Sequence, residues 1–136
     1  MGRVYNFTVD LPFGEELEYE VGTRLYPKHT MYKIDGYFKP FDLVCEYCGL
    51  TIECKSDRYD TGNMAFEVPL LRDSEADLLV YKVMGKTYWA KMSEVRYWIA
   101  LGHELGLLKP QKMGENGNQG YIIPISDTIA YMEVLW

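Results

Sequence analysis

The sequence predicts an α/β fold in one domain, with a strand-rich middle between helices. Two strand-like runs meet at a tight turn within residues 41–55, and a second pair meets at Gly85. Apolar residues recur at helical spacing in 15–25 and in the stretch that follows Ser93. The length of 136 residues and the hydrophobic content of 48% are enough for one core, so a single domain over 1–136 is expected.

A strand and a helix are predicted first along the chain. Residues 4–9 alternate apolar and polar side chains, which is typical of a strand. In 15–25, EELEYEVGTRL, three apolar side chains fall at i, i+4 and i+8 on one helix face. Pro27 follows and ends the helix.

Two predicted hairpins and a further strand form the middle of the chain. The strand-like runs are FDLVCE and TIECK on either side of YCGL, a strand at 64–68, and a pair at 78–83 and 87–92. The first hairpin is interpreted with Cys48 and Gly49 as its two central turn residues.

The last third of the chain predicts one helix and one strand. Ser93 is the expected N-cap of a helix that ends before Gly106. Residues 114–120 contain three glycines and two asparagines and predict a loop, and 121–125 predict a strand. Residues 126–136 favour neither state.

Composition narrows the class of protein. The aromatic content argues against disorder. No apolar run approaches the ~20 residues that span a bilayer, and the first residues lack signal-peptide order. A cytoplasmic protein with no membrane partner is therefore expected. The net charge of −6 counts against a nucleic-acid partner held by bulk electrostatics, although carboxylates collected for a metal also make the sum negative.

The first hairpin brings polar side chains together. With the turn above, Val44 would face Glu53 and Asp42 would face Lys55, so that all four project from one side of the sheet. Two neighbouring carboxylates repel unless a cation lies between them, and a hard ion such as Mg²⁺ suits them. Lys55 would help to activate a water and stabilise charge on a phosphoryl group. A metal-assisted hydrolase is the predicted function.

A fourth acid is predicted on the first helix. Glu18 borders the apolar face, where a carboxylate is costly unless it is paired or bound to a metal. An ordinary surface glutamate is the alternative interpretation. Glu15, Glu16 and Glu20 are interpreted as a solvated acidic face.

Together these residues resemble the PD-(D/E)XK nuclease superfamily, which has the restriction-endonuclease-like fold. Its core is a helix, a hairpin carrying Asp and then Glu-x-Lys, a third strand and flanking helices. The matching segments are GEELE (14–18), FDLV (41–44), IECKSD (52–57), TGNMAFE (61–67) and ADLLVY (76–81). One departure is that Phe41 separates Pro40 from Asp42, where the family has proline directly before the acid.

The resemblance implies a mixed central β-sheet flanked by helices and a Mg²⁺-dependent deoxyribonuclease in which Mn²⁺ can substitute. Asp42 and Glu53 would bind the metal with the carbonyl of Cys54. Lys55 would be the catalytic lysine, and Glu18 would be the helix acid.

The resemblance also implies the partner. Asn63 and Glu67 look like the site-flanking loop and strand of small phage and archaeal-virus nucleases or of Holliday-junction resolvases, and Asn63 would bind substrate. DNA, including branched DNA, would be the partner, and a homodimer would span two strands. Junction, flap, end and duplex stay open as substrates.

Other interpretations of the same residues stay open. Asp42 and Lys55 would also suit a plain cross-strand salt bridge. Cys45 and Cys48 form C-x-x-C, typical of a zinc or redox site, which Cys54 and one of the two histidines would complete. Packing of Cys45 and Cys54 under the helix is the alternative.

Two other function classes are carried with the nuclease. One is a non-catalytic interaction or regulatory protein with a nuclease-like fold, which the net charge favours. The other is a cysteine-based zinc module.

Overall fold

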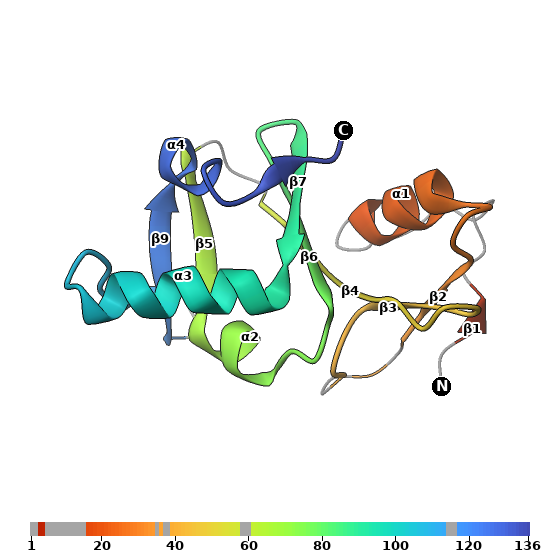
Figure 1. Cartoon of the computed structure of the whole chain (residues 1–136), viewed down its shortest axis with the longest axis horizontal. Coiled ribbons are helices and arrows are strands. Elements are labelled where there is room, and N and C mark those ends of the chain that lie inside the picture. The colour runs from red at the N-terminus through yellow and green to blue at the C-terminus, as the bar shows by residue number, and fades with distance from the viewer. Residues whose placement is uncertain (1–2, 5–15, 35, 37–38, 58–60, 114–116) are drawn as a thin grey trace.

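A mixed β-sheet extends through the computed structural model, which describes residues 3–4, 16–34, 36, 39–57, 61–113 and 117–136. Its strands are β1 (Arg3–Val4), β2 (Met31–Lys33), β3 (Leu43–Cys45), β4 (Thr51–Ser56), β6 (Leu78–Val83), β7 (Lys86–Lys91) and β10 (Glu133–Val134). They are arranged in the order β1-β2-β3-β4-β6-β7-β10 (Figure 1). β4 and β6 run parallel, and the other neighbours run antiparallel. The predicted α/β class with a mixed sheet is confirmed.

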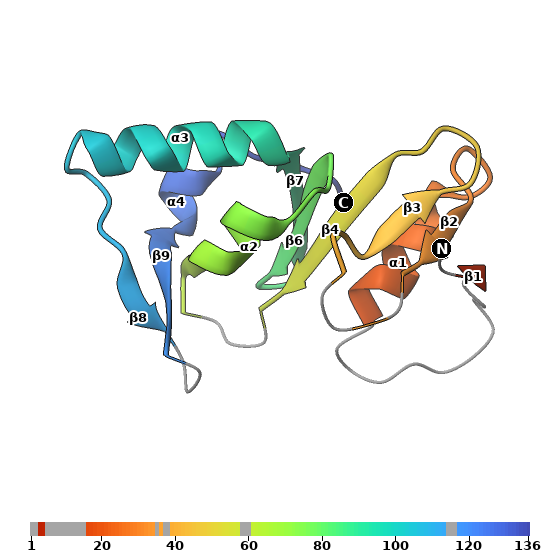
Figure 2. The same cartoon turned by 90° about the horizontal axis from the view of Figure 1, so that it is seen from below.

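A smaller antiparallel sheet and four helices complete the described part of the chain. The sheet order is β5 (Asn63–Glu67), β9 (Asn118–Pro124) and β8 (Gln111–Met113). The helices are α1 (Glu16–Leu25), α2 (Val68–Asp73), α3 (Met92–Glu104) and α4 (Ile125–Thr128). Figures 1 and 2 show α1 at one end of the molecule and the other three helices towards the opposite end. Among the described residues, no helix has the length and apolar character needed to cross a membrane.

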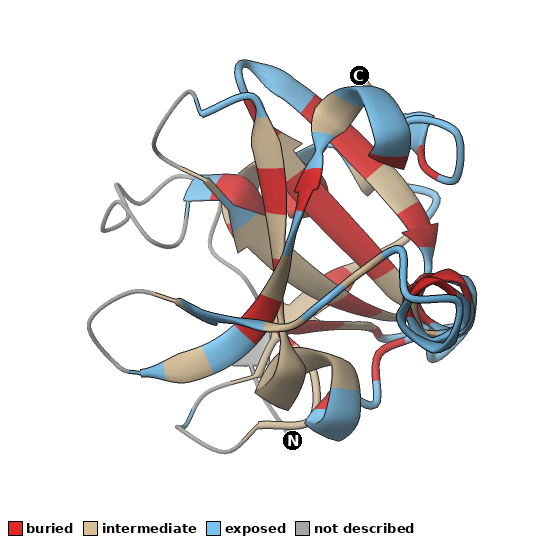
Figure 3. Ribbon diagram, turned by 90° about the vertical axis from the view of Figure 1, so that its left-hand side faces the viewer, coloured by how far each residue is buried: buried red, intermediate tan, exposed pale blue. Residues whose placement is uncertain are grey.

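Side chains of β6 alternate between two hydrophobic clusters. Val80 joins a cluster that contains Leu17 and Val21 of α1. Leu79 and Tyr81 join a second cluster, to which α3, β5 and β9 contribute. Successive strand side chains point to opposite faces, so α1 covers one face of the sheet, and α3 with the small sheet covers the other. Buried residues accordingly concentrate along the central strands (Figure 3).

The first helix is confirmed within the described residues. Leu17 and Val21 are almost fully buried, at 3% and 0% exposure, as the apolar spacing predicted. Burying such side chains contributes about 1.5–3 kcal/mol each. The solvated interpretation is wrong for Glu20, which pairs with Lys82 at 3.0 Å and accepts a hydrogen bond from Trp136 Nε1.

The β3–β4 hairpin is confirmed, but its pairing differs from the prediction by two residues. Leu43 pairs with Ile52 and Val44 pairs with Thr51, whereas the prediction placed Val44 opposite Glu53. A shift of two preserves the face of every side chain, since strand side chains repeat with period two. The alternation that groups the polar residues is therefore retained.

The length of the turn explains the different register. The N–H of Cys45 donates to the carbonyl of Leu50 at 2.8 Å, which encloses four residues instead of two. Gly49 within this turn has φ +76°, a conformation that favours glycine. The pairing, continued by one residue, places Asp42 beside Glu53.

The β6–β7 hairpin and helix α3 are the types of element that the sequence predicted. β6 and β7 turn at Met84 and Gly85, both with positive φ, the pattern of a two-residue hairpin turn. Helix α3 begins earlier than predicted: Lys91 is its N-cap, with no side-chain cap, so the assignment of this role to Ser93 is wrong. The N–H of Met92 instead donates to the backbone carbonyl of Asp77 at 2.9 Å, and this tertiary contact fixes the start of the helix.

Several elements were not predicted. β2 has only three residues, and α2 follows directly on a strand, with proline at its first turn. Residues 126–136 include the end of α4 and β10. The predicted strand 4–9 lies outside the described residues after Val4, and the loop predicted at 114–120 lies outside them at 114–116.

Candidate active site

Three carboxylates from three elements meet near the start of β3. Glu18 comes from α1 and Asp42 from the residue before β3, with exposures of 7% and 4%, and Glu53 is half-buried on β4. Asp42 Oδ2 accepts a hydrogen bond from the backbone N–H of Cys54 at 2.7 Å. Strand N–H groups lie in the plane of the sheet, so the Asp42 oxygen that accepts this bond lies close to that plane. Glu18 lies on the α1 side and Glu53, in register with Leu79, projects on the other.

Two lysines partly neutralise this acid group, by which we mean Glu18, Asp42 and Glu53. Lys39 Nζ lies 2.8 Å from Asp42 Oδ1, and Lys33 Nζ lies 3.3 Å from Glu18 Oε2. That oxygen of Glu18 is buried, and the Lys33 ammonium is its ion-pair partner among the described residues. A buried carboxylate is costly unless a positive group lies beside it, and Lys33 supplies that charge for Glu18.

The charges of the acid group shift its protonation. Burial first, and then the charge of Asp42 and the hydrogen bond that the two carboxyls share, raise the pKa of Glu53 to about 8. Burial and the charge of Asp42 also raise the pKa of Glu18, while Lys33 acts in the opposite direction. Near neutral pH, Glu53 therefore holds a proton.

Ser74 supports Glu53 from outside the motif. Its Oγ donates to Glu53 Oε1 at 2.9 Å from the residue that ends α2. Arg96 of α3 fixes that helix end by donating to the carbonyls of Leu71, at 2.6 Å, and of Ser74. No sequence signal pointed to Ser74, because its contact depends on how α2 packs against the sheet.

Lys55 lies on the same face of β4 as Glu53 but pairs elsewhere. Its Nζ is 3.2 Å from Glu67 Oε1 and 5.8 Å from the ring centre of Tyr81. The cross-strand salt bridge between Asp42 and Lys55 is contradicted, since Asp42 pairs with a different lysine. The structure thus brings Lys55 to Glu67 at the end of β5.

Asn63 and Glu67 stand at opposite ends of β5. The N–H of Asn63 donates to Thr61 Oγ1 at 3.2 Å and its side-chain amide donates to the carbonyl of Thr61, within its own loop. Glu67 is four positions further along the strand, a distance of ~13 Å. Glu67 reaches Lys55, and a substrate-binding role for Asn63 stays a prediction.

Cys54 presents its backbone to the acid group and its thiol to the core. The N–H and C=O of one strand residue point to the same neighbour, so its carbonyl shares the edge at which Asp42 is held. Burial, followed by the charges of Asp42, Glu18 and Glu53, raises the pKa of the thiol and keeps it neutral. Cys45 and Cys54 both pack with the α1 cluster, which confirms that part of the prediction.

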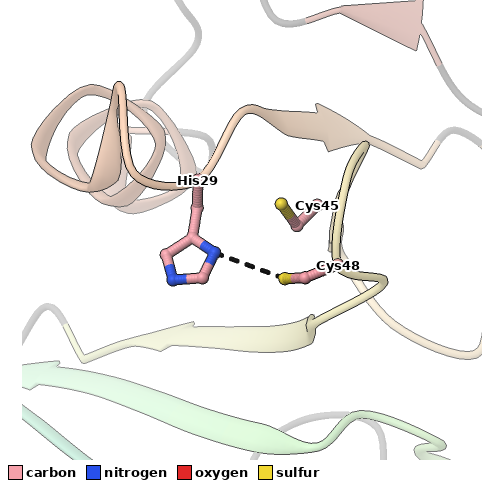
Figure 4. Close-up of side chains that lie close together, drawn as sticks. All are labelled: His29, Cys45 and Cys48. Carbon is pink, nitrogen blue, oxygen red and sulfur yellow. Dashed lines mark hydrogen bonds between the residues drawn. The ribbon is translucent and has the colours of Figure 1, made fainter.

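A second group of ligand-type side chains lies at the other end of the hairpin. His29, Cys45 and Cys48 point toward one another (Figure 4), and their ligand atoms all lie within 4.8 Å of each other. Among the described residues, this is the one set of three Cys, His or acidic side chains so close together. Taken as a set, the carboxylate oxygens of the acid group are therefore farther apart than these three ligand atoms. Burial raises the pKa of the Cys45 thiol, but hydrogen bonds from the N–H of Cys48 and from His29 lower it to about 6.

An apolar groove runs beside α3. Trp98 stacks on Tyr131 with ring centres 5.0 Å apart, and Tyr97 and Leu101 complete much of the lining. Tyr97 is 70% exposed. Among the described residues of its lining, Glu94 is the one acidic residue.

Comparison with protein families, with curated proteins and with solved structures finds no match for this chain. The assignment of the site consequently depends on its own residues.

Proposed function

We propose that this protein is a Mg²⁺-dependent nuclease that hydrolyses phosphodiester bonds in DNA, with the acid group as its metal site. The observation that carries the proposal is the convergence of Glu18, Asp42 and Glu53 beside two lysines, which can balance only two of the three carboxylates. Burial and the charge of Asp42 raise the pKa of both glutamates, and Glu53 keeps its proton up to about pH 8. Such perturbed acids cluster at functional sites.

The donor set fits a hard divalent ion. Carboxylate and carbonyl oxygens suit Mg²⁺, which usually takes one or two carboxylates and keeps sites for water and phosphate oxygens. Asp42 and Glu53 would hold the ion with the Cys54 carbonyl, and Glu18 would border it. Bound there, Mg²⁺ would supply Lewis-acid polarisation of the phosphodiester.

The residues of the chain have distinct tasks in this proposal. Glu53 would release its proton when the ion binds, and Lys39 would leave Asp42 Oδ1, 2.8 Å away at present. Ser74 would hold the freed Glu53 carboxylate in place through its hydroxyl. The Cys54 N–H would keep Asp42 oriented throughout.

Lys55 would act on the phosphate rather than on the ion. Its partner Glu67 is 41% exposed, so water would solvate that carboxylate when Lys55 rotates away from it. The ammonium would then stabilise the negative charge that develops on the phosphoryl group.

A second candidate function is a non-catalytic interaction protein with the same architecture. Two observations favour it. Both oxygens of Asp42 already have partners, Lys39 and the Cys54 N–H, and the net charge of −6 does not attract DNA.

Cleavage of labelled DNA decides between the two functions. Branched, single-stranded and duplex DNA would be incubated with the protein and Mg²⁺ or Mn²⁺, or with a chelator. We expect metal-dependent cutting that Glu53→Gln reduces by on the order of 100-fold or more. Glu104→Gln, which changes an exposed glutamate at the end of α3, is the matched control and should cut like the parent.

Two results would count against the nuclease. Cutting by Glu53→Gln at the parent rate would show that the acid group takes no part in hydrolysis. A folded parent that neither cuts any of the substrates nor gains thermal stability from Mg²⁺ would favour the interaction protein.

A further inference from the structure

A histidine and two cysteines converge where the tip of the β3–β4 hairpin meets the connection between α1 and β2. Cys45 is the last residue of β3, Cys48 lies in the turn, and His29 precedes β2 (Figure 4). Cys48 Sγ and His29 Nδ1 are 3.4 Å apart, and all three ligand atoms lie within 4.8 Å of one another. Neither the acid group nor the proposed hydrolysis uses these residues.

The spacing matches the edges of a tetrahedral zinc site. Zinc–ligand bonds of about 2.3 Å to sulfur and about 2.0–2.1 Å to nitrogen place sulfur and nitrogen ligands about 3.6 Å apart, and two sulfurs about 3.8 Å apart. The observed sulfur–nitrogen distance of 3.4 Å already agrees with this edge. The other separations need to contract by about 1 Å at most, within the reach of small side-chain rotations.

The backbone holds the three residues in place independently of any ion. The N–H of Gly49 donates to the carbonyl of Cys45 at 3.1 Å, which shapes the turn around Cys48. The N–H of His29 continues the α1 pattern by donating to Leu25 at 2.8 Å. The N–H of Glu46 donates to Thr30 at 2.9 Å, so the turn and the segment of His29 are already joined. The ligand positions are therefore preorganised.

The chemistry of the donors selects the ion. Two sulfurs and an imidazole suit zinc, whereas magnesium prefers oxygen. All three cysteines of the chain are free thiols, so both sulfurs are available. Cys45 is buried and Cys48 is exposed, so the ion would lie at the surface, with its fourth position open to water.

We infer that His29, Cys45 and Cys48 form a zinc site that fastens the hairpin tip to the α1–β2 connection. The site is separate from the acid group and does not depend on the nuclease proposal. Its expected effect is structural: zinc joins the element that follows α1 to the hairpin that carries Asp42 and Glu53.

The test measures zinc directly. The full chain, purified with reductant and without chelator, should contain about one zinc per chain by elemental mass spectrometry. After removal of the zinc, titration of the reduced protein with Zn²⁺ should restore one ion and raise the thermal unfolding temperature. Millimolar Mg²⁺ should not displace it.

The chain offers matched controls for the ligands. Cys48→Ala and His29→Asn should bind Zn²⁺ at least 100-fold more weakly than the parent. Cys54→Ala and His103→Asn, which remove the remaining cysteine and histidine, should retain parental affinity. Circular dichroism of each variant would establish that it is folded, and Cys48 is exposed enough for its substitution to leave the core intact.

Two outcomes would overturn the inference. One is a reduced parent that contains no zinc and gains no stability from added Zn²⁺. The other is parental zinc affinity in both ligand variants. DNA cleavage is not a readout here, so failure of the zinc site and failure of the nuclease would be seen separately.

Discussion

At the scale of single residues, Glu53 is the most informative group in the molecule. Its carboxyl is placed by β4, contacted by Ser74, and held close to the charge of Asp42. The resulting pKa of about 8 means that its charge changes across the physiological range. Binding of a cation at the acid group must consequently depend on pH.

The first residue-scale prediction is that Mg²⁺ affinity rises with pH. Below about pH 8 each bound ion displaces a proton from Glu53, so affinity should increase about tenfold per pH unit and level off above that value. Calorimetric titration in buffers of different ionisation enthalpy would count the released proton. Glu53→Gln should lose the dependence, and a parent affinity that does not vary with pH would contradict the assignment.

The same shift has a consequence for the stability of the metal-free protein. The pKa of Glu53 is raised from 4.5 to about 8, so the folded state binds more protons than the unfolded state between these values. The contribution of Glu53 to the free energy of unfolding is therefore fully present below about pH 4.5 and is lost as the pH rises towards 8. At pH 8 Glu53→Gln should be more stable than the parent by about 2 kcal/mol, measured by urea unfolding.

The types of residue at the site were predictable, but their partners were not. Asp42, Glu53 and Glu18 follow from the hairpin pattern and the helix face. Asp42 pairs with Lys39, three positions earlier in the chain, and not with Lys55. Lys39 precedes β3 in a segment without helix or strand periodicity, so no periodic signal in the sequence marks this pair.

At the scale of elements, the end of α2 decides how Glu53 is supported. Ser74 follows the helix directly, and Arg96 from α3 holds that end through two backbone carbonyls. The Ser74 N–H also donates to Leu70 at 3.0 Å. The hydroxyl that contacts Glu53 is thus anchored by two helices.

Replacement of Ser74 by alanine should therefore raise the pKa of Glu53 further, because the Ser74 hydrogen bond lowers it. Mg²⁺ affinity at pH 7 should fall several-fold, and the midpoint of the pH profile should move upward. The loss of stability should be about 1 kcal/mol. Ser93→Ala, which alters an exposed serine of α3, is the control, and an unmoved midpoint in the Ser74 variant would show that the bond has no influence.

Elements with a strong period were predicted from the sequence, whereas short or abrupt ones were not. α1 and both hairpins have clear patterns, and the structure contains them. α2 was missed because its apolar residues continue those of β5, so the run resembled one strand. The hairpin register was missed because a four-residue turn and a two-residue turn are both compatible with Gly49.

At the scale of the whole molecule, the last residues of the chain contact the first helix. Trp136 donates from Nε1 to Glu20, and the Arg24 guanidinium lies 4.7 Å above its ring centre. Leu135 and Trp136 pack against the α1 cluster, and their backbones bond to Thr87 of β7. The position of α1, and with it Glu18, therefore depends on residues far away in sequence.

Truncation of Trp136 to alanine should lower the free energy of unfolding by about 1–3 kcal/mol, because it removes apolar contacts and the cation–π interaction. Mg²⁺ affinity should fall with it, since α1 presents Glu18. Trp136→Phe preserves a ring over Arg24 and should lose less. Chemical unfolding of all three proteins measures the order, and equal stability of the alanine variant and the parent would show that α1 is held without this contact.

The bond between Glu20 and Trp136 spans 116 positions of the chain. A growing polypeptide on the ribosome already contains α1, the β3–β4 hairpin, Asp42 and Glu53 when this tryptophan is still to be made. Its carboxylates are then present without their final arrangement. On the proposed function, the acid group would therefore reach its final arrangement only after Trp136 has been made and has docked on α1.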